Sequence, residues 1–188
     1  MDPLEITEMV ASEGPSQSGF SLTMRDVKMY GLKDAVIEKT EFDFDKKHVV
    51  FDSRVPLMVI LGKYEIGGRI LILPISGKGD INITLTNNRL TYTYDFTIQE
   101  RDGVRYHVSK NQRVVLTPSG ARYSMSNLFN GDKLLGNQMN DFINENWKDI
   151  YKSMSPAITE AFAQVIGSIV NNIADVLPFD ALFPETIP

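Results

Sequence analysis

The feature that most constrains this chain is an alternation of apolar and polar residues that continues to about residue 128. Strands that bury one face of a sheet have this period of two. Turn-forming residues such as Gly67-Gly68, Gly77 with Gly79, and Asp102-Gly103 separate the segments, and such short connections join antiparallel neighbours. Asp2-Pro3-Leu4 predicts the entrance to a first strand, and the later predicted strands are 20–31, 36–44, 48–61, 63–77, 80–85, 90–98, 105–116 and 121–128.

The apolar phase changes once within this region. Ile83 and Leu85 occupy odd positions, whereas Tyr92 and Tyr94 occupy even ones. Either a turn at Asn87-Asn88 or a β-bulge would return the later side chains to the inward face. The sequence leaves both alternatives open.

After residue 130 the apolar period becomes that of a helix, and Asp132 can cap its start. Pro156 lies inside the pattern: either Ser155 caps a new helix with the proline at its first position, or one helix continues with a kink. The apolar residues on both sides keep a spacing of four, namely Ile150, Met154, Ile158 and Phe162. The sequence therefore predicts one kinked helix over 132–177, about 65 to 70 Å long at roughly 1.5 Å per residue. Residues 178–188 would form a tail.

These patterns predict an α+β fold in a single domain over residues 1–188. A highly curved antiparallel sheet, formed by residues 1–128, would wrap around the long C-terminal helix, because such a rod is too long to lie across one face of a small sheet. The seam between helix and sheet would be apolar. If side chains fill this seam, it is core; if they leave space, it holds a lipid-like ligand.

Composition argues against several functions. The net charge is −5 with no basic face, so nucleic acid is not an expected partner. The apolar runs are shorter than the roughly 20 residues that cross a bilayer, and the absence of cysteine removes disulfides and thiolate metal sites. The spacing of His48 and His107 does not require them to converge with carboxylates on a metal. We expect no enzyme activity, no metal and no cofactor.

Two groups of aromatic and methionine side chains are candidate walls of a ligand site. Such stripes are ordinarily core, but tyrosine and tryptophan carry polar tips that can orient an oxygen inside an apolar tunnel. Methionine adapts its shape to a ligand. The predicted wall residues are Tyr92, Tyr94 and Phe96 on one strand face, and Met139, Phe142 and Trp147 on one helix face.

Several segments resemble the Takeout and juvenile-hormone-binding-protein family of insects. They are "DPLEI", "VKMYGLKD", "GKYEIGGRILILPISGKGD", "NLFNGDKLLGNQMNDFINENWKDIYKSMSPAITEAF" and "VLPFDALFP", in this order along nearly the whole chain. The combination of "LFNGDK", "NENW" and a proline inside the helix is specific. The resemblance implies the BPI-like, TULIP-type fold and a secreted carrier with an internal tunnel. Its ligand would be juvenile hormone in one branch, and long-chain or isoprenoid-like molecules in the Takeout branch.

The chain also departs from the family pattern. Family members usually carry a signal peptide and an N-terminal cysteine pair before the "DPL" element, and the hormone-binding branch has a further disulfide, whereas this sequence has no cysteine. The difference favours the Takeout branch and predicts a shortened form with one end of the tunnel uncovered. Secretion is implied by the resemblance alone. Asn82-Ile83-Thr84 fits the glycosylation pattern, which matters only for a secreted chain.

The sequence thus predicts a non-enzymatic, monomeric carrier of a small hydrophobic molecule, held between sheet and helix. The alternative is a protein-interaction or regulatory module, linked to feeding or circadian behaviour, whose seam is filled by core side chains.

Overall fold

The computed structural model describes residues 2–12 and 19–183. The chain divides into two compact units. The first unit comprises Met1–Val36, Arg54–Arg89 and Leu116–Ile158, and the second comprises Ile37–Ser53, Leu90–Val115 and Thr159–Pro188. Each unit is therefore assembled from three separate stretches of chain. That residues 1–188 form one domain stays a prediction.

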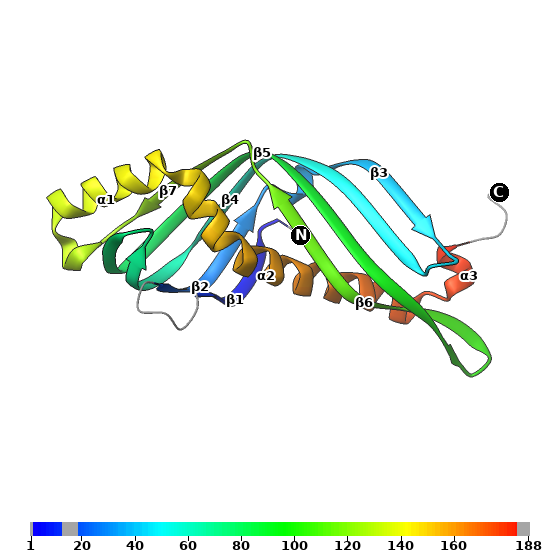
Figure 1. The fold of residues 1–188 in the computed structure, drawn as a ribbon. Helices are drawn as coiled ribbons and strands as arrows, with labels where there is room; N and C mark the ends of the chain where they lie inside the picture. Colours follow the sequence, from blue (N-terminus) through cyan, green and yellow to red (C-terminus); the bar gives the residue numbers. More distant parts are fainter. Residues whose placement is uncertain (1, 13–18, 184–188) are drawn as a thin grey trace. The chain divides into compact units, whose positions relative to one another are not determined.

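Strands precede helices along the chain, as the change of period predicts (Figure 1). The sheet has the order β1-β2-β4-β5-β6, with β3 paired to β4 and β7 paired to β5. The strands are β1 (Leu4–Ser12), β2 (Phe20–Tyr30), β3 (Val36–Asp43), β4 (His48–Ile70), β5 (Leu73–Arg101), β6 (Val104–Thr117) and β7 (Gly120–Met125). The helices are η1 (Leu32–Asp34), η2 (Phe129–Gly131), α1 (Lys133–Glu145), α2 (Trp147–Val176) and α3 (Phe179–Leu182).

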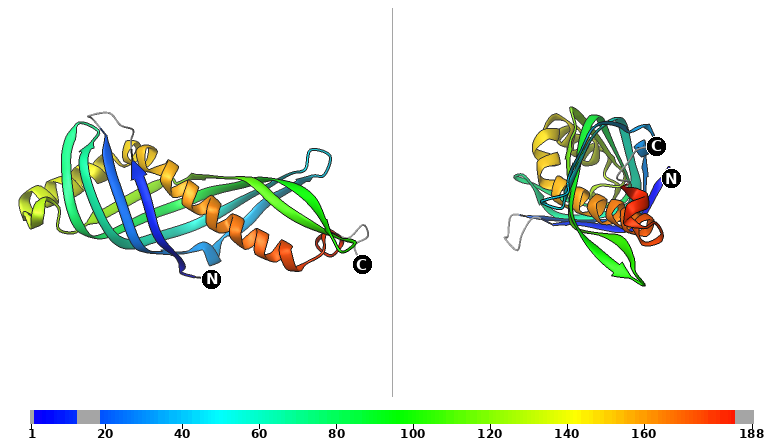
Figure 2. Two further views of the ribbon diagram at one scale, coloured as in Figure 1. Left: turned by 90° about the horizontal axis from the view of Figure 1, so that it is seen from below. Right: turned by 90° about the vertical axis from the view of Figure 1, so that its right-hand side faces the viewer.

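In the first unit, β1 runs antiparallel alongside β2 (Figure 2), from the pair Leu4 and Met29 to the pair Ser12 and Ser21. The strand predicted to begin at Asp2-Pro3-Leu4 is confirmed. β2 pairs antiparallel with β4, and the register shifts between Arg25 and Lys28.

β4 and β5 are longer than predicted, because several glycines lie within strands. The turn between β4 and β5 falls at residues 71–72, and the predicted breaks at Gly67-Gly68 and at Gly77 with Gly79 are wrong. A Cβ atom on Gly77 would lie 3.0 Å from the Cα of Leu128, and one on Gly79 would lie 2.6 Å from the carbonyl oxygen of Ser126. These two glycines therefore permit a close approach of backbones, which is the other common use of glycine in a strand.

β5 also continues through Asn87-Asn88, so the alternative of a turn at this point is wrong. The buried positions change from odd numbers, ending at Leu85, to even numbers, beginning at Asn88. Asn87 has a positive φ of 46°, a local irregularity that accounts for the change of phase within one strand. Asn88 is fully buried, and its amide donates to the backbone carbonyls of Val55 and Leu85 at 3.0 and 3.1 Å.

The predicted helix over 132–177 is interrupted at Asn146, not at Pro156. Asn146 has φ −104° and ψ 25°, which separates α1 from α2, although its N–H still donates to the Phe142 carbonyl at 3.1 Å. α2 passes through Pro156, so the alternative of a new helix beginning there is wrong. A proline lacks the N–H that would bond the carbonyl four residues earlier. The hydroxyl of Ser155 donates to that carbonyl, on Lys152, at 3.2 Å.

The start of α1 agrees with the sequence. A carboxylate oxygen of Asp132 accepts a hydrogen bond from the Leu135 N–H at 3.0 Å, which is the predicted N-cap. The predicted tail contains α3 at Phe179–Leu182, and residues 184–188 lie outside the described part of the chain.

Within the first unit, α1 lies beside β7 (Figure 1) and covers its backbone. Asn140 accepts from the Met125 N–H and donates to the Met125 carbonyl, each at 2.9 Å. Asn144 makes the same pair of bonds with Tyr123, each at 2.8 Å. Because an edge strand has unpaired backbone groups, these two asparagines, one helical turn apart, act in place of a neighbouring strand.

The second unit joins β6 to the later part of α2 through polar contacts. The amide oxygen of Asn171 accepts from the N–H of Ser109 at 3.0 Å and from its hydroxyl at 2.7 Å. At the end of β5, the guanidinium of Arg101 donates to Asp175 of the same helix at 3.1 Å. A Cβ atom on Gly167 would lie 2.4 Å from the end of the Gln112 side chain, so a larger residue at this position would require Gln112 to move.

Candidate ligand-binding site

A pocket of about 280 Å³ lies within the second unit. The end of β5 and the start of β4 supply aromatic side chains to it, and α2 and α3 supply aliphatic ones. Apolar side chains make up most of its wall, which is typical of sites for small organic molecules. The lining residues are Phe42, Phe51, Tyr94, His107, Val170, Ile173, Ala174, Leu182 and Phe183.

Aromatic rings from β3, β4, β5 and β6 pack around this pocket. Phe51 stacks on both Tyr92 and Tyr94 with ring centroids 6.4 Å apart, and Phe42 meets Phe183 edge to face at 5.2 Å. Alternation along β5 puts Tyr92, Tyr94 and Phe96 on one face, and all three are buried. The site is therefore built from strand periodicity, with rings that keep their positions at low entropic cost.

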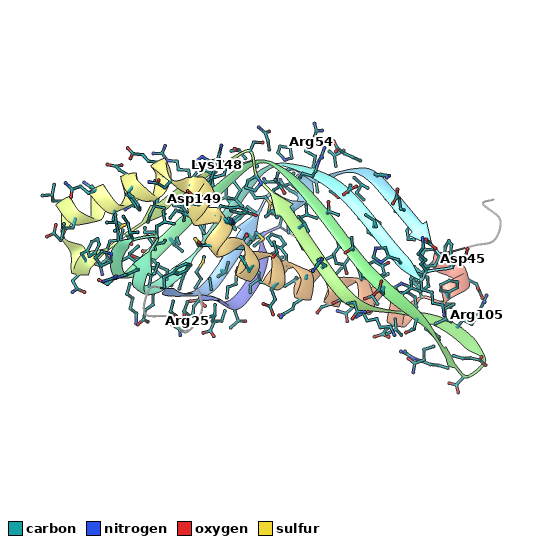
Figure 3. The ribbon with its side chains drawn as sticks, viewed as in Figure 1. Arg25, Asp45, Arg54, Arg105, Lys148 and Asp149 are labelled. Carbon is teal, nitrogen blue, oxygen red and sulfur yellow. The ribbon has the colours of Figure 1, made fainter. Side chains whose placement is uncertain are left out.

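α3 and the residue after it form one wall of the pocket, through Leu182 and Phe183. Figure 3 shows Arg105 next to α3, where its guanidinium donates to the carboxylate of Asp180. The central carbon of the Arg105 guanidinium also lies 5.6 Å from the ring centroid of Phe179. Both partners of the ion pair are half exposed, so we expect it to contribute at most about 1 kcal/mol to stability. Phe179 of α3 also contacts the rings of Phe96 and Phe183, with centroids 6.2 and 5.1 Å away.

His107 is a polar group in this apolar wall. Only 2% of its surface is exposed, and neither ring nitrogen has a hydrogen-bond partner among the described residues. Burial lowers the pKa of His107. A contact of the imidazole with its own backbone raises the pKa by a smaller amount. This contact lacks the geometry of a hydrogen bond. The imidazole is therefore neutral near pH 7, with one N–H donor and one acceptor nitrogen.

The tyrosines of the site are also neutral. Burial raises the pKa of Tyr92 and of Tyr94 to about 12. The hydroxyl of Tyr92 is buried and has no partner among the described residues. The site thus combines apolar walls with a few uncharged polar groups.

The structure places the six predicted wall residues in both units. Tyr94 lines the pocket of the second unit, and Tyr92 and Phe96 belong to the ring cluster around it. Met139, in the first unit, is buried and lines another pocket of about 350 Å³ with Leu73, Pro74, Phe129, Leu135 and Gln138.

Phe142 and Trp147 are half-buried and line neither of these two pockets. The ammonium nitrogen of Lys148 lies 5.8 Å from the Trp147 ring centroid. The part of all six residues in ligand binding stays a prediction, with the strongest geometric support for Tyr94.

Eight of the nine pocket residues were missed from the sequence: the ring-bearing Phe42, Phe51, His107 and Phe183, and the aliphatic Val170, Ile173, Ala174 and Leu182. Phe42 and Phe44 alternate with Glu41, Asp43 and Asp45. This alternation predicts that the two phenylalanines lie on the face of the strand opposite to the carboxylates, and it could have identified Phe42. Phe179 and Phe183 are spaced by four residues, as on one face of a helix. The burial of His107 had no sequence signal beyond its place in a strand.

His48 takes part in a structural contact. Its Nδ1 lies 2.8 Å from Asp95, whose other oxygen accepts from the Asn111 amide at 2.9 Å. These hydrogen bonds hold the pKa of Asp95 below its usual value, and the bond from Asn111 has the larger effect. In the described part of the chain there is no cluster of three or more metal-ligating side chains. None of the described helices is sufficiently long and apolar to span a bilayer.

An antiparallel sheet, a long C-terminal helical segment and an aromatic pocket define a class of apolar-ligand-binding proteins. Comparison with known proteins agrees. The sequence model of the haemolymph juvenile hormone binding protein family matches residues 1–184, and the chain belongs to this family. Its members are binding proteins rather than enzymes, and they generally take hydrophobic ligands.

Two relatives are the circadian clock-controlled protein daywake of Drosophila melanogaster and of Drosophila yakuba. The first is 29% identical over 98% of this chain and 74% of its own length, and the second is 27% identical over 97% and 74%. The crystal structure of Takeout 1 from Epiphyas postvittana superposes with a TM-score of 0.86 at 30% identity, covering 95% of this chain and 81% of Takeout 1. The predicted family and the α+β fold, a curved antiparallel sheet with a long C-terminal helical segment, are confirmed.

Proposed function

We propose that this chain is a carrier that binds one small hydrophobic molecule in the aromatic pocket of the second unit. The observation that carries the proposal is the pocket itself, about 280 Å³ lined by phenylalanine, tyrosine and aliphatic side chains. A ligand that buries about 300 Å² of apolar surface gains roughly 7 kcal/mol before ordering costs, at about 25 cal/mol per Å². Binding in the micromolar range or weaker is then expected.

The ligand class follows from the walls. Alkyl and isoprenoid chains make the same demands on aromatic and aliphatic side chains, so juvenile-hormone-like molecules, other isoprenoids and long-chain lipids are all candidates. The family description names haemolymph, which supports a place outside cells. The relatives named as clock-controlled support a role in rhythmic physiology.

The test is uptake of an apolar fluorescent probe by the purified protein, with displacement by isoprenoid and alkyl compounds. Ala174→Phe should fill the pocket, because Ala174 is buried and lines it. Val176→Phe is the matched control, because Val176 is 73% exposed on the same helix. We expect the first variant to lose probe uptake and the second to retain it. Circular dichroism checks that both fold, since overpacking costs about 1–3 kcal/mol.

Mass spectrometry of organic extracts from the protein purified from its source would identify a natural ligand. Absence of both probe uptake and any co-purified molecule would overturn the carrier proposal. It would favour the alternative, in which the pocket is core and the outer surface recognises a protein partner.

A further inference from the structure

We propose that His107 is the polar anchor of the pocket, and that the preferred ligand is an apolar chain bearing one oxygen-containing head group that hydrogen-bonds the imidazole. Alcohols, esters and carboxylic acids share this chemistry, and pure hydrocarbons lack it. The inference rests on the proposed function, because it specifies which hydrophobic molecule the same pocket would select.

The first step is that the ring faces and the ring edge of His107 have different surroundings. Phe96 stacks on the imidazole with centroids 5.0 Å apart and planes at 28°, and Tyr94 meets it edge to face at 5.4 Å. These neighbours offer apolar contact to the ring but no acceptor or donor to its nitrogens. Both ring nitrogens are buried in the ligand-free protein. Because His107 lines the pocket, a turn of the ring would present its polar edge to a molecule held there.

The second step is energetic. Buried polar side chains almost always have a hydrogen-bond partner, and one without a partner costs the protein free energy. His107 is 2% exposed, and both its nitrogens lack partners among the described residues. A phenylalanine would fill the same space without this cost. The position is therefore better suited to a complex with a ligand than to the empty protein.

The third step concerns the charge of the head group. Burial lowers the pKa of His107, so the ring meets the ligand as neutral imidazole. It can donate one hydrogen bond to a carbonyl or hydroxyl oxygen and accept one from a hydroxyl or an un-ionised carboxyl. Uncharged oxygen groups fit this environment, because an ionised group in an apolar pocket would lose its hydration.

The experiment compares displacement of the fluorescent probe by 1-dodecanol and methyl dodecanoate with displacement by dodecylbenzene. We expect His107→Phe to weaken binding of the two oxygen-bearing compounds roughly threefold to tenfold, the usual effect of one lost hydrogen bond. Binding of dodecylbenzene should be unchanged. His107→Gln, which keeps a donor and an acceptor, should recover part of the preference.

A readout independent of affinity comes from the ligand-free protein. If His107 had a purely structural role, His107→Phe would lower the melting temperature. We expect the melting temperature of ligand-free His107→Phe to be equal or higher, and the upward shift caused by 1-dodecanol to be smaller than in the wild type.

The imidazole can also be observed directly, because the chain has only two histidines. In a ring-¹⁵N-labelled sample, methyl dodecanoate should move the resonances of His107 and leave those of His48 in place. His48→Gln assigns the two rings.

The two proposals fail in different ways. If the wild type takes up neither probe nor ligand, the proposed function falls. A second outcome is that the wild type binds all three compounds, His107→Phe weakens the binding of all three equally or not at all, and the His107 resonances do not move. This outcome would overturn the proposal that His107 is the anchor and leave the carrier proposal intact.

Discussion

At the scale of single residues, the buried tyrosines link stability to alkaline pH. Burial raises the pKa of Tyr64, Tyr92 and Tyr94 to about 12, above the ordinary value near 10. The folded state therefore holds these protons more tightly than the unfolded chain does. Their contribution to stability is fully present below about pH 10 and is lost as pH rises towards 12.

We accordingly predict that the free energy of unfolding falls steeply between about pH 10 and 12. Urea unfolding at several pH values, with tyrosinate absorbance recorded in parallel, would measure this fall. Tyr92→Phe should show a shallower decline. At pH 7 the same variant should be as stable as the wild type or more so, because it removes a buried hydroxyl that has no partner among the described residues. An equal alkaline slope in both proteins would contradict the assignment.

Strand alternation was enough to predict the inward face that carries Tyr92, Tyr94 and Phe96. It could not predict His107 as part of the pocket, because alternation shows that a side chain is buried but not whether its polar atoms find partners. Trp147 became a candidate through its position on the apolar stripe of the helix. The structure leaves it half-buried, and its part in ligand binding stays a prediction.

At the scale of elements, the contact between α1 and β7 depends on two amides. Asn144→Ala would leave the N–H and the carbonyl of Tyr123 without their partners on α1, at an expected cost of about 1–3 kcal/mol. Urea unfolding measures this loss, and hydrogen exchange at Tyr123 should accelerate. Asn137→Ala is the control, because Asn137 is exposed on the same helix and should change stability by less than about 0.5 kcal/mol. Equal stability of the two variants would rule out the strand-like role of Asn144.

The helices also show what a sequence pattern can locate. The spacing of four through Ile150, Met154 and Ile158 correctly predicted that the helix continues past Pro156. The interruption at Asn146 was not predictable, because an asparagine within a helical pattern can either stay helical or leave helical geometry. The spacing of the apolar residues does not distinguish the two. The long β4 and β5 were missed for a similar reason: a glycine that permits a close backbone contact looks, in sequence, like a glycine that forms a turn.

At the scale of the whole molecule, export from the cell would allow N-glycosylation of the chain. Asn82 is exposed on β5, opposite Ser124 of β7, in the pattern Asn82-Ile83-Thr84. We predict that the chain secreted from insect cells carries a glycan at this position. Endoglycosidase treatment and Asn82→Gln should both remove the added mass. A secreted wild type of unmodified mass would show that this site is not used.

We expect the two units to unfold in a single transition. β4, β5 and α2, of 23, 29 and 30 residues, each pass from one unit into the other, so neither can lose its strands without disturbing the other. We predict coincident transitions for the fluorescence of Trp147, the single tryptophan, in the first unit, and for the His107 resonances in the second. Separate midpoints would mean that the units unfold independently.

This interleaving also restricts how the binding site can diversify. Because each unit is drawn from three stretches of one polypeptide, no continuous piece of gene encodes the aromatic pocket by itself. Exchange of exons between relatives cannot transplant it intact. We therefore expect new ligand preferences to arise by replacing individual side chains of the pocket in place.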